Sequence, residues 1–343
     1  MTLLPGNMRA DLPPGPRFAA DTAPRAWTAA TLAPSQTFVD LPAGVNAEIQ
    51  AALQGIRDNG LTLETVEQED FRAPSFARMV GAIHQRLDGP GIAIIRGLDL
   101  TGLAEGDVDI LSWALCNYVG RPIRQGLQQD RRLFTVTDNR AQHDDPIRIG
   151  ATTQESRMHT DNGCLEPRAP DYVALLCVNA SEAGGESTLV SAASVHRVLR
   201  EESGNLLPEL YSRFHFLPPR LHTWPAGPKT ICKPIFEAVG EELHVHYARV
   251  MVEPGMELAG TPLSETQRAA LDRLDDVVAR PSLVFQYALR PGEILINNNL
   301  TTLHGRRAYK DASGTPRMLK RIWMWRRHRG AGDDPVLLDA AEL

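Results

Sequence analysis

The spacing of apolar residues along the chain predicts helices on both sides of a set of strands. Helical spacing occurs in residues 45–57, 75–87, 105–118, 193–200 and 265–279. At the start of the last segment, Ser264 and Gln267 form a capping box, because each side chain can satisfy a free backbone N–H. We therefore expect helices before and after a central β-rich region.

Short apolar runs between glycine and proline residues predict the buried strands. They occupy residues 92–97, 170–178, 187–191, 294–299 and 317–325. Gly184 and Gly185 form a turn before the third run. In the last run, the odd-numbered residues from Arg317 to Trp325 share one face if the segment is extended. Arg317 and Arg321 are then neighbours on that face.

The tripeptide His159-Thr160-Asp161 follows a segment without helical spacing, so it is expected to be extended. Side chains alternate along a strand, and His159 and Asp161 therefore point the same way. A third candidate, His304, comes far downstream. Two imidazoles and one carboxylate form the ligand set of mononuclear non-haem Fe(II) oxygenases, because they occupy one face of the metal and leave the other open. A redox enzyme is therefore the leading interpretation.

Each of these residues also has a purely structural interpretation. His304 could be a core or turn histidine whose nitrogens are satisfied. Arg317 and Arg321 could be solvated strand charges, since a cationic cluster follows at residues 326–329. The joint occurrence of all these features in one order favours the metal site.

That combination resembles a known family. The resemblance is carried by His159-Thr160-Asp161, residues 184–189, residues 298–306 and the pair Arg317 and Arg321. These motifs look like the TauD/TfdA-like branch of the Fe(II)/2-oxoglutarate-dependent oxygenases, which includes taurine dioxygenase and clavaminate synthase-like enzymes. The resemblance runs from about residue 89 to about residue 325 and is most specific in its C-terminal half.

The resemblance implies a role for each matched residue. His159, Asp161 and His304 would bind Fe(II), and Arg317 would pair with the distal carboxylate of 2-oxoglutarate through two parallel hydrogen bonds. Thr188 would hydrogen-bond the same cosubstrate, although a shift of one residue would give that role to Ser187.

Arg321 would lie nearer the metal, beside the keto-acid end of the cosubstrate or an anionic group of the substrate. The implied reaction uses O₂ to hydroxylate an unactivated C–H bond, with release of succinate and CO₂. Desaturation and cyclisation remain open, whereas Asp161 argues against halogenation, because related halogenases lack the carboxylate ligand.

The resemblance also implies a mainly β fold with flanking helices, a distorted double-stranded β-helix or jelly roll. We expect an irregular N-terminal arm at residues 1–40, one oxygenase domain at 41–330 and a C-terminal tail at 331–343. An insert at about 195–285 would serve as a lid that shapes the substrate pocket.

Weaker candidates lie outside the motifs. Arg249 is a tentative substrate contact beyond the strand-like run at 243–247, which also holds His244 and His246 without a neighbouring carboxylate ligand. Glu155 lies four residues before His159, on the same strand face if the strand extends that far, and is equally interpretable as a surface charge.

Composition limits the partners. The formal net charge is −6, which gives no electrostatic reason to expect a nucleic acid or an anionic membrane, so a small-molecule substrate is expected and a homo-oligomer is left open. Four scattered cysteines indicate reduced thiols. The N-terminus lacks the pattern of a signal peptide, and we expect a cytoplasmic protein.

Two other classes of function compete with the oxygenase. A metal-dependent hydrolase or lyase on a similar barrel would use its metal to activate water and would not need Arg317. A non-catalytic barrel would bind a ligand without turnover.

Overall fold

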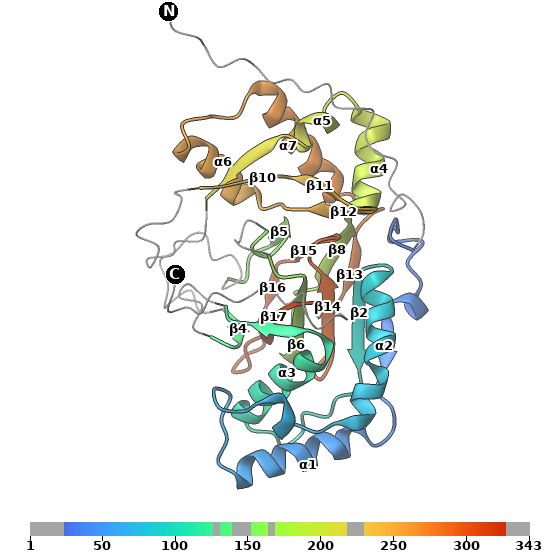
Figure 1. Cartoon of the computed structure of the whole chain (residues 1–343), viewed down its shortest axis with the longest axis vertical. Helices are drawn as coiled ribbons and strands as arrows, with labels where there is room; N and C mark the ends of the chain where they lie inside the picture. The colour runs from blue at the N-terminus through green and yellow to red at the C-terminus, as the bar shows by residue number, and fades with distance from the viewer. Residues whose placement is uncertain (1–23, 126–130, 139–151, 164–168, 218–229, 327–343) are drawn as a thin grey trace, which may run out of the picture.

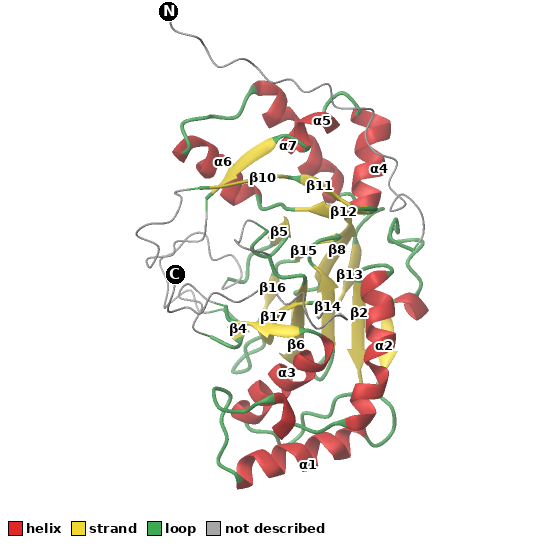
Figure 2. Cartoon of the chain, viewed as in Figure 1, coloured by secondary structure: helices red, strands yellow, loops and turns green. Residues whose placement is uncertain are grey.

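Two β-sheets face each other at the centre of the molecule, and helices pack around them (Figures 1 and 2). The computed structural model describes residues 24–125, 131–138, 152–163, 169–217 and 230–326. The predicted arm up to residue 23 and the predicted tail at 331–343 lie outside these residues.

The larger sheet contains seven strands in the order β1-β2-β14-β6-β17-β3, with β4 also paired to β17. Its pairs are antiparallel except β1 with β2. The strands are β1 (Phe38–Asp40), β2 (Ile92–Arg96), β3 (Arg121–Ile123), β4 (Phe134–Val136), β6 (Tyr172–Asn179), β14 (Ile294–Asn298) and β17 (Met318–Trp325). The strands predicted at residues 92–97, 170–178, 294–299 and 317–325 are confirmed as β2, β6, β14 and β17, whereas β1, β3 and β4 were not predicted.

The smaller sheet has the order β13-β8-β15-β5 and is antiparallel. Its strands are β5 (Ser156–His159), β8 (Ser187–Ser191), β13 (Phe285–Tyr287) and β15 (Thr302–Arg306). Two short strands, β7 (Ala183–Gly184) just before β8 and β16 (Tyr309–Lys310) just after β15, form a separate antiparallel pair. Chain segments more than 100 residues apart therefore meet at β5 and β15.

An apolar layer joins the two sheets. Ile94, Leu295 and Leu319 of the larger sheet pack with Leu189 of the smaller sheet, and all four are almost fully buried. Burial of each such side chain contributes about 1.5–3 kcal/mol. This packing fixes which face of β15 and β17 points into the space between the sheets.

Helices α2 (Pro74–Asp88) and α3 (Glu105–Val119) cover the other face of the larger sheet, and α1 (Val45–Asp58) packs against both of them. The buried apolar residues of the three helices share one core with Ile322 and Met324 of β17. The predicted helices in these regions are confirmed to within one residue at each end. Alternate residues of β17 thus face the helices or the space between the sheets.

The segment between β8 and β13 forms a second core at the top of Figure 1. It contains α4 (Ala192–Ser203), α5 (Leu207–Leu210), α6 (Arg249–Leu258), α7 (Glu265–Val278), β9 (Arg213–Phe216), β10 (Ile231–Pro234), β11 (Phe236–Val239) and β12 (Glu242–Val245). The capping box of α7 is present, since Ser264 Oγ accepts from Gln267 N at 3.1 Å. The helices α5 and α6 were not predicted.

The described part of the expected arm is ordered against the domain. Trp27 is buried and donates its indole N–H to Pro90 O at 2.7 Å, and β1 extends the larger sheet. The sheet therefore begins before residue 41. Within the described residues, Cys116, Cys177 and Cys232 are free thiols, and no helix has the length and apolar character needed to cross a membrane.

Candidate metal centre

The pairing of β5 with β15 brings two distant histidines together. His159 lies directly opposite His304 in the antiparallel register, and their ring centroids are 4.5 Å apart. Residues directly opposite each other project from the same face. That face also carries Leu189, the residue of β8 opposite His304, so both imidazoles point into the space between the sheets.

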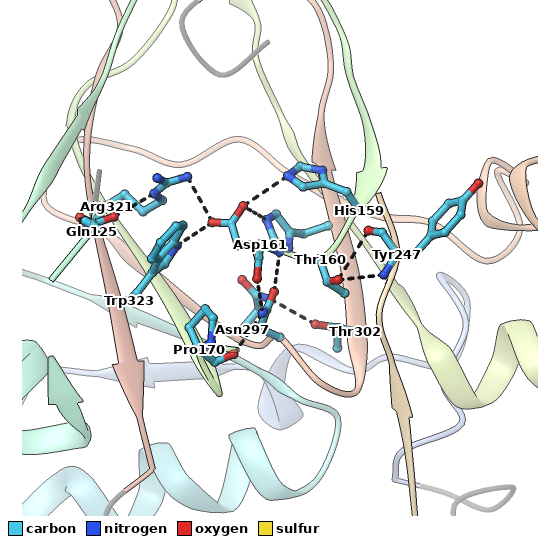
Figure 3. A network of polar contacts seen from close by, with 12 residues as sticks. Gln125, His159, Thr160, Asp161, Pro170, Tyr247, Asn297, Thr302, Arg321 and Trp323 are labelled. Atoms are coloured by element: carbon cyan, nitrogen blue, oxygen red, sulfur yellow. Dashed lines mark hydrogen bonds and ion pairs between the residues drawn. The ribbon is translucent and has the colours of Figure 1, made fainter. Parts of the chain in front are cut away.

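Asp161 completes the cluster two residues beyond His159 (Figure 3). Its Oδ1 lies 3.3 Å from His159 Nε2 and 3.6 Å from His304 Nε2. One ligand atom from each of the three residues lies within 4.8 Å of the other two. The predicted cluster of His159, Asp161 and His304 is therefore assembled, with two imidazole nitrogens and one carboxylate oxygen converging on one point.

The ring orientation of His159 suits a metal ligand. Its Nδ1 lies 2.8 Å from Arg157 O, which can only accept, so Nδ1 donates to that carbonyl and Nε2 is the nitrogen that faces the cluster. His304 Nδ1 is buried and has no hydrogen-bond partner within the described residues.

Asp161 is held from several sides. Its Oδ2 accepts from Arg321 Nη1 at 3.1 Å and from Trp323 Nε1 at 2.7 Å (Figure 3). The side chain of Asn299, fully buried, accepts from Asp161 N and donates to Asp161 O, both at 2.8 Å. Oδ2 and the backbone are thus occupied by the protein, and Oδ1 is left facing the histidines.

The electrostatics set the protonation states. Burial raises the pKa of Asp161, but the charge of Arg321 and the hydrogen bonds of both histidines outweigh it and hold the pKa well below its usual range. Burial lowers the pKa of His159, yet the hydrogen bond and charge of Asp161 raise it above its ordinary value. Burial and the charge of His159 lower the pKa of His304. An ionised carboxylate and a neutral His304 are the forms that a cation requires.

A second cluster contains the buried cations Arg306 and Arg317, and Arg306 follows His304 by two residues on β15. Arg306 and Arg317 both stack on the ring of Tyr309, with guanidinium carbons 4.7 and 5.1 Å from its centroid. Arg317 Nη2 donates to Gly185 O at 3.3 Å, whereas Arg317 Nη1, Arg306 Nε and Tyr309 Oη are buried with no hydrogen-bond partner among the described residues. Burial and the charge of Arg317 lower the pKa of Arg306 to about 10. This arrangement favours an anion.

The register of β8 separates the two hydroxyl candidates. Ser187 lies opposite Arg306 and therefore on the inward face, next to the cationic cluster. Thr188 lies opposite Gly305, and its Oγ1 is 3.8 Å from Met158 Sδ on the other face. Because faces alternate, Ser187 and not Thr188 lies on the face that carries His304 and Arg306.

The weaker candidates have other partners. Arg249 does not continue a strand but is the first residue of α6, where its guanidinium binds Glu253, Asp272 and Asp275. Glu155 is exposed and forms a surface ion pair with Arg307 at 2.9 Å. Both side chains are therefore engaged by charged groups of the protein itself.

Two histidines without a predicted ligand role also have partners. His244 contacts Glu242, and His246 Nε2 lies 3.1 Å from Glu237 Oε2. Neither joins the metal cluster.

Sequence reasoning missed Gln125, whose Oε1 accepts from Arg321 Nε at 3.1 Å, because no motif surrounds it. The sequence analysis also gave no role to Trp323. It did predict that Trp323 lies on the same face of β17 as Arg321, and this alternation could have indicated that Trp323 is near the site.

The facing sheets and the inward cluster define a mononuclear metal enzyme on a jelly-roll scaffold. Residues 57–323 match the model of the "Taurine catabolism dioxygenase TauD, TfdA family". The chain belongs to this family and is an Fe(II)/2-oxoglutarate-dependent dioxygenase.

Individual relatives agree with this assignment. The chain is 27% identical to FR-33289 synthase of Streptomyces rubellomurinus over 84% of this chain and 85% of the relative. It superimposes on asparagine oxygenase in complex with Fe(II), 2S,3S-3-hydroxyasparagine and succinate with a TM-score of 0.65, 20% identity and coverage of 84% and 93% of the two chains.

The non-heme iron oxygenase OrfP, in complex with Fe, succinate and (3S)-hydroxy-L-Arg, gives a TM-score of 0.61 at 16% identity and covers 84% and 94%. These similarities confirm the predicted jelly-roll fold.

The residues present fit the iron and the cosubstrate. Three converging ligand atoms match the facial two-histidine, one-carboxylate set for Fe(II). The unpartnered Nη1 of buried Arg317 is a donor that fits a carboxylate of 2-oxoglutarate. The hydrolase and non-catalytic alternatives are therefore excluded by the family and have no support in the site.

Proposed function

We propose that this enzyme hydroxylates an unactivated C–H bond of an α-amino acid, with His159, Asp161 and His304 as the iron ligands. The observation that carries the proposal is the position of Arg321, a cation whose Nη1 lies 3.1 Å from the ligand carboxylate of Asp161. A substrate whose anionic group binds at Arg321 would hold its neighbouring carbons close to the iron.

The cosubstrate would bind between the metal cluster and the buried cations. Arg317 would donate to the distal carboxylate of 2-oxoglutarate through Nη1, and Ser187 would add a hydroxyl hydrogen bond from the facing strand. Arg306 lies two residues from His304 on one strand face, which corresponds to about 7 Å. That separation suits a five-carbon dicarboxylate reaching from the metal to the cationic cluster.

The substrate would bind at the exposed side of Arg321. Its side chain is 21% exposed, unlike the buried Arg317, so an anion can approach it from solvent. Gln125 fixes Nε and the ring of Trp323 stacks on the guanidinium at 4.5 Å, which hold the charge in one orientation. The structural neighbours hold hydroxylated asparagine and hydroxylated arginine, which supports an amino acid over other small anions.

Bound iron supplies O₂ activation coupled to the decarboxylation of 2-oxoglutarate to succinate and CO₂. The chain's own residues perform the remaining tasks. Arg317 and Ser187 would orient the cosubstrate, and Arg321 would orient the substrate. Desaturation and cyclisation, the alternative reactions, would use the same residues in the same roles.

A substrate screen tests this proposal. Purified enzyme with Fe(II), ascorbate and 2-oxoglutarate is incubated with each proteinogenic amino acid and, as matched controls, with the amines that lack the α-carboxylate. We expect succinate release above the substrate-free rate for at least one amino acid, with a product 16 mass units heavier, whereas a product 2 units lighter would indicate desaturation or cyclisation. Stimulation by the amine as strong as by its amino acid would contradict carboxylate recognition.

A pair of variants localises the recognition. Arg321→Lys keeps the positive charge beside Asp161 but loses the planar fork, so the KM for the amino acid should rise at least tenfold, about 1.4 kcal/mol, while the affinity for 2-oxoglutarate is kept. Arg249→Lys, in the ion-pair network of α6, should leave both parameters unchanged.

A further inference from the structure

The carboxylate of Asp161 is divided between the protein and the metal cluster. Its Oδ1 faces His159 Nε2 and His304 Nε2, whereas Oδ2 accepts two hydrogen bonds from β17. We propose that Trp323 is a positioning residue that holds the Asp161 carboxylate with Oδ1 aimed at the metal cluster, by binding Oδ2 with its indole N–H. The inference rests on the ligand role of Asp161 proposed above.

The hydrogen bond from Trp323 is well placed for this task. Nε1 donates to Oδ2 at 2.7 Å, and the residue is only 6% exposed. An indole has a single donor and no acceptor, so in this position it can serve only Asp161. The backbone of Trp323 is fixed on both sides, opposite Val173 of β6 and Ile123 of β3.

Arg321 alone is a weaker restraint on Oδ2. Its Nη1 lies 3.1 Å from Oδ2, but its side chain is more exposed and its Nε is engaged by Gln125. The guanidinium also stacks on the Trp323 ring at 4.5 Å, so its own position depends on the tryptophan. Trp323 therefore restrains Asp161 both directly and through Arg321.

The fixed orientation has a functional reason. Two imidazoles and one carboxylate oxygen would hold one face of the iron and leave the other face for the cosubstrate and O₂. A carboxylate free to rotate would hold Oδ1 on the metal less firmly, so loss of the indole N–H is expected to weaken metal binding.

Trp325 offers a matched comparison on the same strand face. It is 7% exposed and packs with Trp323 and Val173 in one apolar cluster, but its Nε1 is buried without a hydrogen-bond partner among the described residues. Loss of the indole from either position removes a similar buried ring. Only at position 323 does it also remove a hydrogen bond to a metal ligand.

The test compares Trp323→Phe with Trp325→Phe by Mn(II) binding, followed through the EPR signal of the free ion, in protein without cosubstrate. We expect Trp323→Phe to weaken Mn(II) binding about 10- to 100-fold, the usual effect of removing a partner of a metal ligand. Trp325→Phe should bind Mn(II) within about twofold of the wild type. Equal Mn(II) affinities of the two variants would overturn the proposal.

A second replacement separates the hydrogen bond from packing. Site-specific replacement of Trp323 by β-(3-benzothienyl)alanine keeps the shape of the ring and removes only the N–H. It should reproduce the loss of Mn(II) affinity, with a melting temperature of the metal-free protein close to the wild-type value. Wild-type Mn(II) affinity in this protein would refute the role of the N–H. Failure of the wild type itself to bind Mn(II) would instead refute the metal site on which the inference rests.

Discussion

Ser187 lies directly opposite Arg306 in the antiparallel pair of β8 and β15. This relationship places the serine hydroxyl on the face that carries His304, and it turns the adjacent Thr188 toward Met158 on the other face. Ser187 and Thr188, two adjacent hydroxyl residues that were candidates for the same role, thus have different surroundings.

The first prediction follows from this register. Ser187→Ala should weaken 2-oxoglutarate binding by roughly 10- to 100-fold, because a hydrogen bond to a charged group contributes about 1.5–3 kcal/mol. Thr188→Val, which has nearly the same shape as threonine, should bind 2-oxoglutarate as the wild type does. Isothermal titration of the Mn(II)-loaded proteins measures both affinities, and a larger effect at Thr188 would reverse the assignment.

The second prediction concerns the glycine that contacts Arg317. Gly185 has φ +78°, and a Cβ there would lie 3.1 Å from Arg317 Nε and 2.7 Å from Ser181 Oγ. Gly185→Ala should displace the guanidinium and raise the Kd for 2-oxoglutarate at least tenfold, about 1.4 kcal/mol, with unchanged Mn(II) affinity.

Gly240→Ala is the matched control for backbone strain, since Gly240 has φ +60° and nothing within 4 Å of its added Cβ. Backbone strain should cost each variant about 1–2 kcal/mol of stability, but only the substitution at Gly185 should affect the cosubstrate. If both variants bound 2-oxoglutarate equally well, the contact with Arg317 would have no role in binding.

The third prediction concerns Lys320, a buried cation on the face of β17 that packs against α3. Lys320 Nζ, with a side chain 1% exposed, lies 2.8 Å from Glu105 Oε1 and from Asp109 Oδ1, which ties α3 to β17. Lys320→Met should destabilise the fold by about 3 kcal/mol, because Asp109 is left without its counter-charge. Urea unfolding measures the loss.

The double variant Lys320→Met with Asp109→Leu should recover most of that stability, since an apolar pair replaces the buried ions. A double variant no more stable than Lys320→Met would show that the ion pair is not what stabilises this contact between α3 and β17.

Much of the site could be predicted because it depends on local alternation. The period of two along a strand places Trp323 beside Arg321 on β17. His159 ends β5 and Asp161 lies in the turn directly after it, so the two predicted ligands converge although the extended segment stops at His159. Helices α1 and α2 were predictable because each has an apolar face with helical spacing, whereas α3 is apolar and buried around most of its circumference.

The errors arose where tertiary structure overrides that period. The register of β15 and β5 shifts between His304 and Arg306, so alternation from His159 does not extend back to Glu155. Arg249 begins a helix that contains Pro254 and is held by packing on β9 and by ion pairs to α7. The choice between Ser187 and Thr188 depended on where β8 begins after two glycines with positive φ, which a single sequence does not fix.

The most direct test of the central claim is an anaerobic optical titration with Fe(II) and then 2-oxoglutarate. The comparison is between the wild type, His304→Ala and His244→Ala, a control histidine that lies outside the metal cluster. We predict a weak visible charge-transfer band in the wild type and in His244→Ala that requires both additions and is absent in His304→Ala. No band in the wild type, or an unchanged band in His304→Ala, would contradict the metal and cosubstrate site described for this chain.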